Sequence, residues 1–260
     1  MKSKRQRGLS PALALLWLAA VFVTLSFAAR VARGALAYRE LERDNASLAG
    51  TYAPEDRKPA TAAELTAEAT EGDRLRAAYP LTVDHAGLKA ANQDYAAWLY
   101  FENAGISLPV VRDSGAGEYL HRSFAGKGSF AGTVFADGEA PEDTVCEFLF
   151  GHNMRDGSMF GGLKRVDYTR RNVFYLDSPD GLTAYEVFAV ARVDRDDALY
   201  TVPAGDDAYT DYVRKIGAAT GRDYTSEAWF LEGARLAALS TCDGKQGTRK
   251  RMIVFGHEVN

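Results

Sequence analysis

Cys242 is the residue of this sequence with the clearest chemical potential. It lies in LSTCDG, residues 239–244, and is one of two cysteines in a chain of 260 residues. Free cysteine is among the most buried side chains in proteins, so a small core residue is one interpretation, and half of a disulfide is another. Cys242, however, ends the apolar run ARLAALSTC and opens a polar loop. That position suits a reactive thiol better than a core thiol, which we would expect in the middle of a strand.

A cysteine nucleophile needs a base or a cation beside it, and histidine is the usual partner. His152 has the best context of the four histidines, because it follows the apolar run TVCEFLF and a glycine in the loop GHNMRDGSMFGG. A histidine where a strand ends can project into a cleft, although a lone loop histidine is more often solvated. His85 and His121 lie in charged segments that we expect to be exposed, and His257 follows the last predicted strand.

An arginine near the thiol would complete a site for acyl transfer. Arg249 and Arg251 both follow Cys242, and Arg251 opens the apolar run RMIV. A cationic donor close to an attacked carbonyl can stabilise the oxyanion, whereas a basic strand end that faces water has no catalytic role. The residue types and their spacing make Cys242, His152 and one of the two arginines a plausible triad.

The composition limits the classes of function. Hydrophobic residues make up 47% and charged residues 25% of the chain, as in ordinary globular proteins. The net charge of -4 gives no electrostatic support for a nucleic-acid partner. Two cysteines are too few for a disulfide framework, and the sequence has no CxxC motif or cysteine/histidine cluster that would suggest structural zinc.

The N-terminal residues predict a membrane anchor. Residues 1–8 form a basic tail, which we assign to the cytoplasm, and residues 9–29 carry no charge. A helix of that length spans about 31 Å, enough to cross a bilayer core of about 30 Å. A cleaved signal peptide is the alternative, since residues 28–29 are small, but the apolar run exceeds the usual length of a signal-peptide core. The basic tail favours, weakly, a cytoplasmic N-terminus and an extracellular C-terminal domain.

The remainder of the chain divides into a stalk, a linker and one folded domain. We assign residues 30–62 to stalk and linker, because 35–48 look helical and 49–62 carry two prolines, and residues 63–260 to the domain. Short helices are predicted from Ala63 onward and over 206–220, the latter capped by Asp206 or Asp207. Strands are predicted over 105–111, 132–137, 144–150, 234–242 and 251–256, with a hairpin over 172–193 that turns at Ser178–Gly181. Many short strands with few helices indicate a closed β-barrel or a sandwich.

Two motifs, in order, resemble class B sortases, the membrane-anchored cysteine transpeptidases of Gram-positive surfaces. They are GHNMRDGSMFGGLKR, residues 151–165, and LSTC, residues 239–242, which an arginine at the start of a strand follows nine residues later. Upstream, LKAANQDYAAWLYFENAGISLPVVR and YLHRSFAGKGSFAGTVFAD resemble the family's entry segment and its next turn and strand. The resemblance covers residues 83–256. It implies a mainly β fold, a sortase-type eight-stranded β-barrel with added helices, here preceded by an N-terminal transmembrane helix.

The resemblance also implies roles for the candidate triad. Cys242 matches the family's nucleophile and His152 its catalytic histidine. Arg251 matches the catalytic arginine because it opens the last strand, with Arg249 as the alternative. Residues 206–220 would fill the place of the helix that the family carries before the catalytic strand.

The remaining candidates lie beside this triad. Ser240, Thr241 and Asn153 are expected to line the substrate pocket, or else to make strand-end hydrogen bonds and cap a loop. Cys146 stands where the family more often has an aliphatic strand residue. It precedes His152 by six residues on a strand, and so would lie roughly 20 Å from a site that joins His152 and Cys242. Disulfide-bonded Cα atoms lie about 4.4–6.8 Å apart, so we predict that Cys146 is a core thiol.

The implied reaction is cleavage of a sorting signal followed by transfer. The Cys242 thiolate would attack the threonine carbonyl of an NPxTN-like motif near the C-terminus of a surface protein and form a thioester. The amino group of a peptidoglycan precursor would then take the acyl group. This chemistry requires no metal and no organic cofactor. Two alternatives stay open: a hydrolytic cysteine protease, with water as the acceptor, and an inactive membrane-tethered assembly module.

Overall fold

The computed structural model describes residues 11–58, 66, 68–115, 117–138, 144–205, 208–244 and 247–260. The chain divides into two compact units, Met1–Ala46 and Ser47–Asn260. The expected basic tail, the first two residues of the expected anchor, and Asp206 and Asp207 lie outside the described residues.

The first unit consists of most of α1 (Pro11–Tyr52), a single helix that runs on into the start of the second unit. It contains an 18-residue window of mean hydropathy 2.3 in which no side chain is buried, so it is long and apolar enough to cross a membrane. The helix predicted over 35–48 is present as a continuation of the same helix. Alanine and leucine dominate its first half, and both favour helix strongly.

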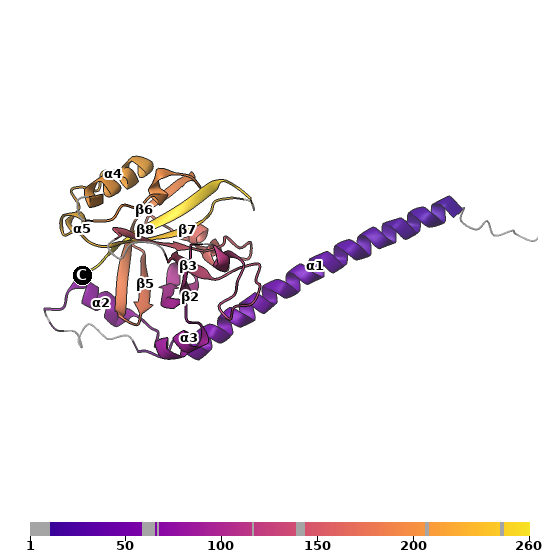
Figure 1. The fold of residues 1–260 in the computed structure, drawn as a ribbon, viewed down its shortest axis with the longest axis horizontal. Coiled ribbons are helices and arrows are strands. Elements are labelled where there is room, and N and C mark those ends of the chain that lie inside the picture. Colours follow the sequence, from indigo (N-terminus) through magenta and orange to yellow (C-terminus); the bar gives the residue numbers. More distant parts are fainter. Residues whose placement is uncertain are drawn as a thin grey trace, which may run out of the picture. The chain divides into compact units, whose positions relative to one another are not determined.

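The second unit is built on a closed, eight-stranded barrel, as the resemblance implied (Figure 1). Around the barrel the strand order is β1-β2-β3-β4-β7-β8-β6-β5, with β2–β3 and β4–β7 parallel and the other neighbours antiparallel. The strands are β1 (Tyr95–Phe101), β2 (Ile106–Asp113), β3 (Val134–Asp137), β4 (Cys146–Phe150), β5 (Val173–Ser178), β6 (Gly181–Asp194), β7 (Leu236–Cys242) and β8 (Lys250–Glu258). Short 3-10 helices interrupt the connections: η1 (Glu102–Ala104), η2 (Glu118–Leu120), η3 (Phe160–Arg165) and η4 (Ala198–Tyr200). The predicted hairpin is β5–β6, which turns between Ser178 and Gly181.

Apolar side chains alternate between the two faces of the strands, so that they fill the inside of the barrel and also pack on its outer surface. Leu149, Leu239 and Val254 are register partners across β4, β7 and β8, and each is at most 1% exposed. Their neighbours along the strands, such as Phe148 and Phe255, belong instead to a cluster with the helix α4 (Tyr209–Thr220) on the outer face. Because successive side chains on a strand point to opposite faces, the first row packs inside the barrel. Strands that are apolar on both faces require cover outside, and helices supply it.

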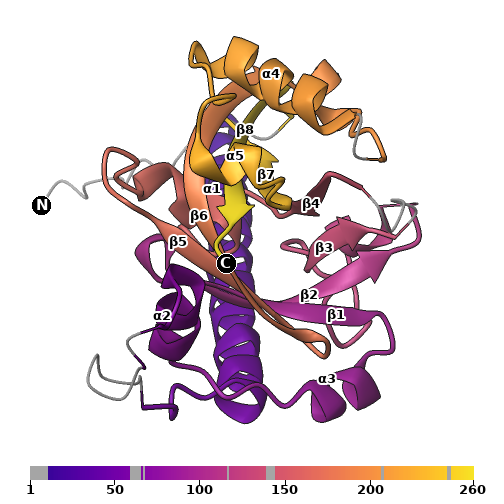
Figure 2. The same cartoon turned by 90° about the vertical axis from the view of Figure 1, so that its left-hand side faces the viewer.

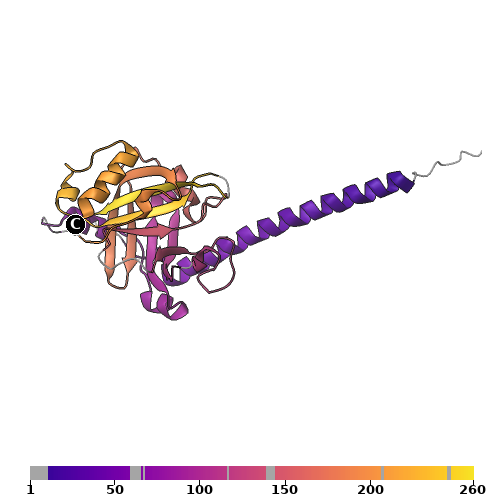
Figure 3. The same cartoon turned by 45° about the horizontal axis from the view of Figure 1, so that its top comes forward.

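One outer face is covered by the segment between β6 and β7. It contains η4, α4 (Tyr209–Thr220) and α5 (Ala228–Leu231), and Figures 2 and 3 show α4 lying along this side of the barrel. Val213 and Ile216, which with Tyr209 show the helical spacing that predicted this helix, are fully buried against strand residues, and so is Tyr212. The predicted region 206–220 thus holds a helix whose described part begins at Tyr209.

The opposite outer face is covered by residues that precede the barrel, and here the structure differs from the expected linker. The end of α1, α2 (Glu71–Ala78) and α3 (His85–Ala91) pack with Tyr79 and Leu81 on β1 and β5 (Figure 2). Residues 52–57 are tied to 80–84 by three backbone hydrogen bonds of 2.7–3.2 Å, and Ala53 is 2% exposed. The described part of residues 49–62 is therefore packed onto the domain. Its apolar side chains cover a sheet face that would otherwise meet water.

Of two other expectations about this region, one falls partly outside the described residues and one is wrong. The short helix expected from Ala63 is described only over α2, with residues 59–65 and 67 outside the described part. His85, expected to be exposed, is half-buried: its Nδ1 lies 2.9 Å from the Tyr95 hydroxyl and its Nε2 lies 3.2 Å from Asp177 Oδ1. Sequence pattern could not show this, because Asp177 reaches His85 from β5, far along the chain.

Candidate active site

Cys242 and Arg251 lie side by side where β7 ends and β8 begins. They are direct register partners in the antiparallel pairing of the two strands. Partners across a sheet point to the same face, with Cβ atoms about 4.5–5.5 Å apart. The thiol and the guanidinium therefore occupy the same side of the barrel at the same end.

His152 is brought beside Cys242 by the parallel pairing of β4 with β7. Phe150 pairs with Ser240, and just beyond the strand the side-chain amide of Asn153 donates to the Gly244 carbonyl oxygen at 3.4 Å. His152 lies between these two contacts on its own segment, and Cys242 lies between them on the other. The two candidate residues are therefore at the same level of adjacent segments.

Cys242 and Arg251 also share a face. Ile253 on β8 belongs to the outer cluster under α4. Since the period of a strand is two residues, Arg251 lies on the face of Ile253, and Cys242 joins it as its register partner. His152 lies two residues beyond Phe150, in the loop that follows the end of β4.

The loop that holds His152 is fixed by close packing. A Cβ on Gly151 would lie 2.8 Å from the Phe160 ring, so only glycine lets that ring reach the backbone. The Phe160 backbone amide donates to the His152 carbonyl oxygen at 2.9 Å. Asn153 and Met159 form an isolated antiparallel β-bridge, and Met159 adopts a left-handed φ of 51°. The spacing of glycine, histidine and phenylalanine in GHNMRDGSMF follows from this fold-back.

The imidazole is oriented by a second segment. His152 Nε2 lies 2.9 Å from the Leu120 carbonyl oxygen, at the end of η2. A carbonyl can only accept, so Nε2 carries the proton in this arrangement. The His121 ring lies 5.8 Å from the His152 ring, centroid to centroid, and is tilted by 30° against it. The histidine is therefore held by contacts from β4, η3 and η2.

Arg249, the alternative for the catalytic arginine, is engaged elsewhere. Its guanidinium binds Asp194 Oδ1 at 2.8 Å and also contacts the Asp196 carboxylate. The Arg195 amide donates to the Arg249 carbonyl oxygen at 2.7 Å. These contacts hold the end of β6 to the start of β8, and leave Arg251 as the arginine beside Cys242. Arg251 itself donates through Nη1 to the Thr248 and Lys250 carbonyl oxygens at 2.8 and 3.0 Å.

Ser240 and Thr241 point in different directions. Ser240 shares the face of Cys242, and its hydroxyl lies 2.7 Å from the Tyr200 hydroxyl. Thr241 points to the other face and donates to the Gly151 carbonyl oxygen at 2.8 Å. The Thr241 hydroxyl thus holds β7 to the histidine loop, which is the strand-end hydrogen bond that the sequence left open. The Asn153 amide likewise ties its loop to Gly244.

Tyr200 is a site residue that the sequence did not indicate. Burial raises the pKa of its hydroxyl; Ser240 and the charge of Arg251 lower that pKa, and a charge on Cys242 raises it. Tyr200 is therefore close enough to both Arg251 and Cys242 to interact with them electrostatically. It is one of 13 tyrosines, and no motif around it distinguishes it.

Asp243, the residue after the candidate nucleophile, is the second contribution that sequence reasoning missed. Its carboxylate lies 3.2 Å from Lys164 Nζ and 3.3 Å from Arg192 Nε, and its amide donates to the Lys250 carbonyl oxygen at 2.9 Å. The two cations come from η3 and β6. Asp243 therefore links the nucleophile's strand to the histidine loop and to the neighbouring sheet.

Cys146 is separate from this site. Both cysteines are free, and Cys146 is 2% exposed at the start of β4, beneath α4. Burial raises the pKa of its thiol, which keeps it protonated. Among the described residues, no group of three or more histidine, cysteine, aspartate or glutamate side chains could hold a metal ion.

A closed barrel with a cysteine, a histidine and an arginine at the ends of adjacent strands defines a class of cysteine-dependent acyl-transfer enzyme. The family model for the sortase domain matches residues 99–259. Sortase B of Listeria monocytogenes is 30% identical over 183 residues, which is 66% of this chain and 72% of that protein.

Solved structures agree in fold. The sortase B structure from Clostridium perfringens has a TM-score of 0.59 at 25% identity, covering 67% of this chain and 99% of that one. A sortase-B-like protein from Bacillus anthracis has a TM-score of 0.65 at 24% identity, covering 85% and 97%. The chain belongs to the sortase family, in class B. It is a cysteine transpeptidase of the cell envelope, and its α1 is a candidate membrane span.

Proposed function

We propose that this sortase cleaves an NPxTN-like sorting signal after its threonine and transfers the released protein to the amino group of a peptidoglycan precursor. The observation that supports the proposal is that Cys242 and Arg251 are register partners across β7 and β8, while His152 follows directly after β4, the other neighbour of β7. α1 would anchor the enzyme in a Gram-positive cell membrane, with a cytoplasmic N-terminus and an extracellular catalytic domain.

The first half-reaction forms an acyl-enzyme. The Cys242 thiolate attacks the threonine carbonyl carbon, and the carbonyl π electrons move to oxygen. Arg251 donates hydrogen bonds to this oxyanion. When the tetrahedral intermediate collapses, the C–N bond breaks, and His152 gives its proton to the departing amine. The products are a thioester on Cys242 and a free C-terminal fragment.

The second half-reaction reverses these roles. The acceptor amine attacks the thioester carbonyl, His152 takes the proton from the attacking nitrogen, and the thiolate leaves. A new amide bond replaces the thioester, and the enzyme returns to its starting state. The Ser240–Tyr200 pair lies beside the nucleophile on the face where the peptide must approach, and we assign it to the wall of the substrate groove.

The test uses the full chain in detergent, mixed with NPQTN-type and LPxTG-type peptides, with intact mass recorded before and after an amine such as hydroxylamine is added. An adduct on the wild type that the amine discharges supports a transpeptidase and identifies its motif. Discharge only by water, even with amine present, would support a protease instead. An absence of any adduct would support the inactive module.

The chain supplies its own matched control for the nucleophile. Cys242→Ala should abolish the adduct, whereas Cys146→Ala removes a buried thiol at the start of β4 and should leave it intact. An adduct that survives Cys242→Ala would contradict the assignment.

A further inference from the structure

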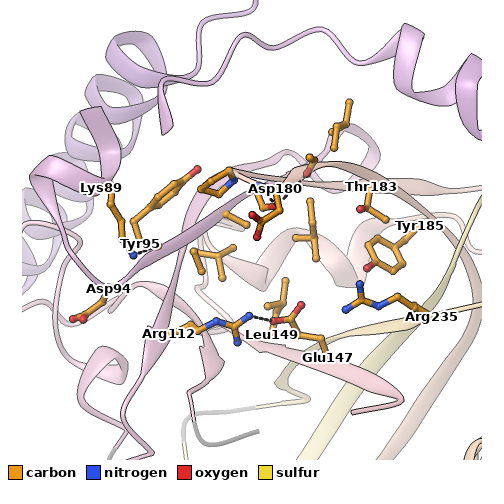
Figure 4. Close-up of a pocket in the computed structure, with 18 of the residues that line it drawn as sticks. Lys89, Asp94, Tyr95, Arg112, Glu147, Leu149, Asp180, Thr183, Tyr185 and Arg235 are labelled. Atoms are coloured by element: carbon orange, nitrogen blue, oxygen red, sulfur yellow. Dashed lines mark hydrogen bonds and ion pairs between the residues drawn. The ribbon is translucent and has the colours of Figure 1, made fainter. Parts of the chain in front are cut away.

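A pocket opens at the end of the barrel opposite the candidate active site. Its volume is 730 Å³, within the range typical of small-ligand sites. Arg235 lines it immediately before β7, whose far end carries Cys242, and Glu147 lines it near the start of β4. The turn of the β5–β6 hairpin, including Asp180, forms another wall (Figure 4).

The pocket has an apolar floor and a charged rim. Ala97, Val110, Leu149 and Leu176 line its floor, and each is at most 9% exposed. The charged side chains that line it come from the surrounding strand ends and α3: Lys89, Asp94, Arg112, Glu147, Asp180 and Arg235. The lining surface of the pocket is therefore mostly polar, with a few buried apolar side chains at its base.

Most of these charges already have partners. Arg112 Nη2 lies 3.1 Å from Glu147 Oε1, and Lys89 Nζ donates to the Tyr95 carbonyl oxygen at 3.0 Å. Asp94 accepts a hydrogen bond of 2.6 Å from the Tyr119 hydroxyl.

One positive and one negative group are left over. Within the described part of the chain, the Asp180 carboxylate and the Arg235 guanidinium make no hydrogen bond or ion pair, and Figure 4 shows both beside the open space. The pocket therefore offers one charge of each sign to a ligand, together with the Thr183 and Tyr185 side chains between them.

The separation of the two groups can be estimated from the sheet. Gly181 and Tyr185 are four residues apart on β6, about 13 Å. Tyr185 pairs with Glu258, whose amide donates to the Arg235 carbonyl oxygen, so Arg235 lies two strand spacings away, about 10 Å. The Gly181 and Arg235 Cα atoms are thus about 16 Å apart and Asp180 lies one residue beyond Gly181, but side chains that reach inward shorten the gap between the two charges. An extended peptide of three or four residues spans about 10–14 Å.

We propose that this pocket binds a short peptide with both termini free, its ammonium group on Asp180 and its carboxylate on Arg235. A planar guanidinium suits a carboxylate because it can donate two parallel hydrogen bonds. The peptide side chains would lie over Leu149 and Leu176. The site is independent of the sorting reaction, since it sits at the other end of the barrel from Cys242.

Isothermal titration calorimetry of the full chain in detergent tests the proposal, with trialanine, its N-acetylated form and its C-amidated form as probes, each titrated into the millimolar range. Trialanine should bind most tightly, and each cap should weaken binding by about threefold to fivefold, as expected for a partly exposed ion pair. An NPQTN-type peptide that is acetylated and amidated at its ends should not compete. Equal binding of capped and free peptides, or no binding by any of them, would overturn the proposal.

Substitutions of Asp180 and Arg235 test which end of the peptide each residue binds. In Asp180→Asn, acetylation of trialanine should not weaken binding any further, whereas amidation should still weaken it. In Arg235→Gln, amidation should have no further effect, whereas acetylation should still weaken binding. Arg170→Gln removes an exposed arginine that does not line the pocket and should leave all three affinities unchanged. Binding that Asp180→Asn and Arg235→Gln leave unaltered would put the peptide elsewhere and refute the assignment.

Discussion

Cys242 and Arg251 face each other across the pairing of β7 and β8, while Arg249, two residues earlier, is bound by Asp194 and Asp196. The antiparallel register thus separates two arginines that the sequence leaves equivalent. One stands beside the thiol, and the other fastens the ends of two strands. This difference leads to a direct test.

Arg251→Gln should lower kcat/KM by about 10²–10³, because the substitution removes the donor assigned to the oxyanion. Arg249→Gln should keep kcat/KM within about twofold of the wild type, as for an exposed residue away from the reacting atoms. Both values come from steady-state cleavage of the motif peptide identified by mass. A larger loss in Arg249→Gln than in Arg251→Gln would reverse the assignment.

The hydrogen bond between Tyr200 and Ser240 should stabilise the fold next to the nucleophile. Tyr200→Phe leaves the buried Ser240 hydroxyl without this partner, which costs about 1–3 kcal/mol. Thermal unfolding of Tyr200→Phe, of Ser240→Ala and of the double variant measures the coupling. The double variant should lose less stability than the sum of the two single losses. Additive losses would mean that the two hydroxyls do not interact.

Gly151→Ala should impair catalysis more than the small size of the added methyl group suggests. The new methyl group would lie 2.8 Å from the Phe160 ring, so either the ring or the His152 loop must move. A shift of about 1 Å at a catalytic group can cost about 10²-fold in rate. Gly128→Ala is the matched control, because a Cβ there meets nothing within 4 Å. Peptide cleavage and the far-ultraviolet circular dichroism spectrum should be measured together, and unchanged cleavage by Gly151→Ala would refute the packing argument.

His257 should make the fold sensitive to acid. Its ring stacks on Trp229 at 4.8 Å, and burial lowers its pKa below the ordinary value of 6.5. Below about pH 6.5 the unfolded chain therefore binds a proton that the folded chain resists, so stability falls as the pH drops toward the lowered pKa. Glu186 and Glu227 oppose the shift, and Arg171 adds to it.

The variant His257→Phe keeps a ring for the stack and removes the proton. Melting temperatures of wild type and variant, measured from pH 7.5 down to 5, should show a smaller loss in His257→Phe. Parallel curves would mean that His257 does not titrate in this window. Other acid-sensitive groups, such as Asp177, are common to both proteins and cancel in the comparison.

Much of the barrel could be predicted because its signals are local. The hairpin β5–β6 turns at Ser178–Gly181 as its turn residues indicate, and α4 buries Val213 and Ile216 at helical spacing. The segment expected as a linker could not be predicted in the same way. Its prolines and charges resemble those of a solvated chain, and only the exposed apolar face of β1 and β5 explains why residues 52–57 pack there.

The sequence by itself determined the types of chemistry available: a thiol at a strand's end, a histidine after a glycine, arginines before the last strand and an apolar N-terminal helix. Each is a local pattern, readable within about ten residues. The tertiary structure decided which of these meet. Tyr200 and Asp243 lie at the site, Arg249 is bound elsewhere, and Thr241 points to the face opposite Cys242. These placements follow from strand register and from the two-residue alternation of side chains, which depend on pairing between segments far apart in the chain.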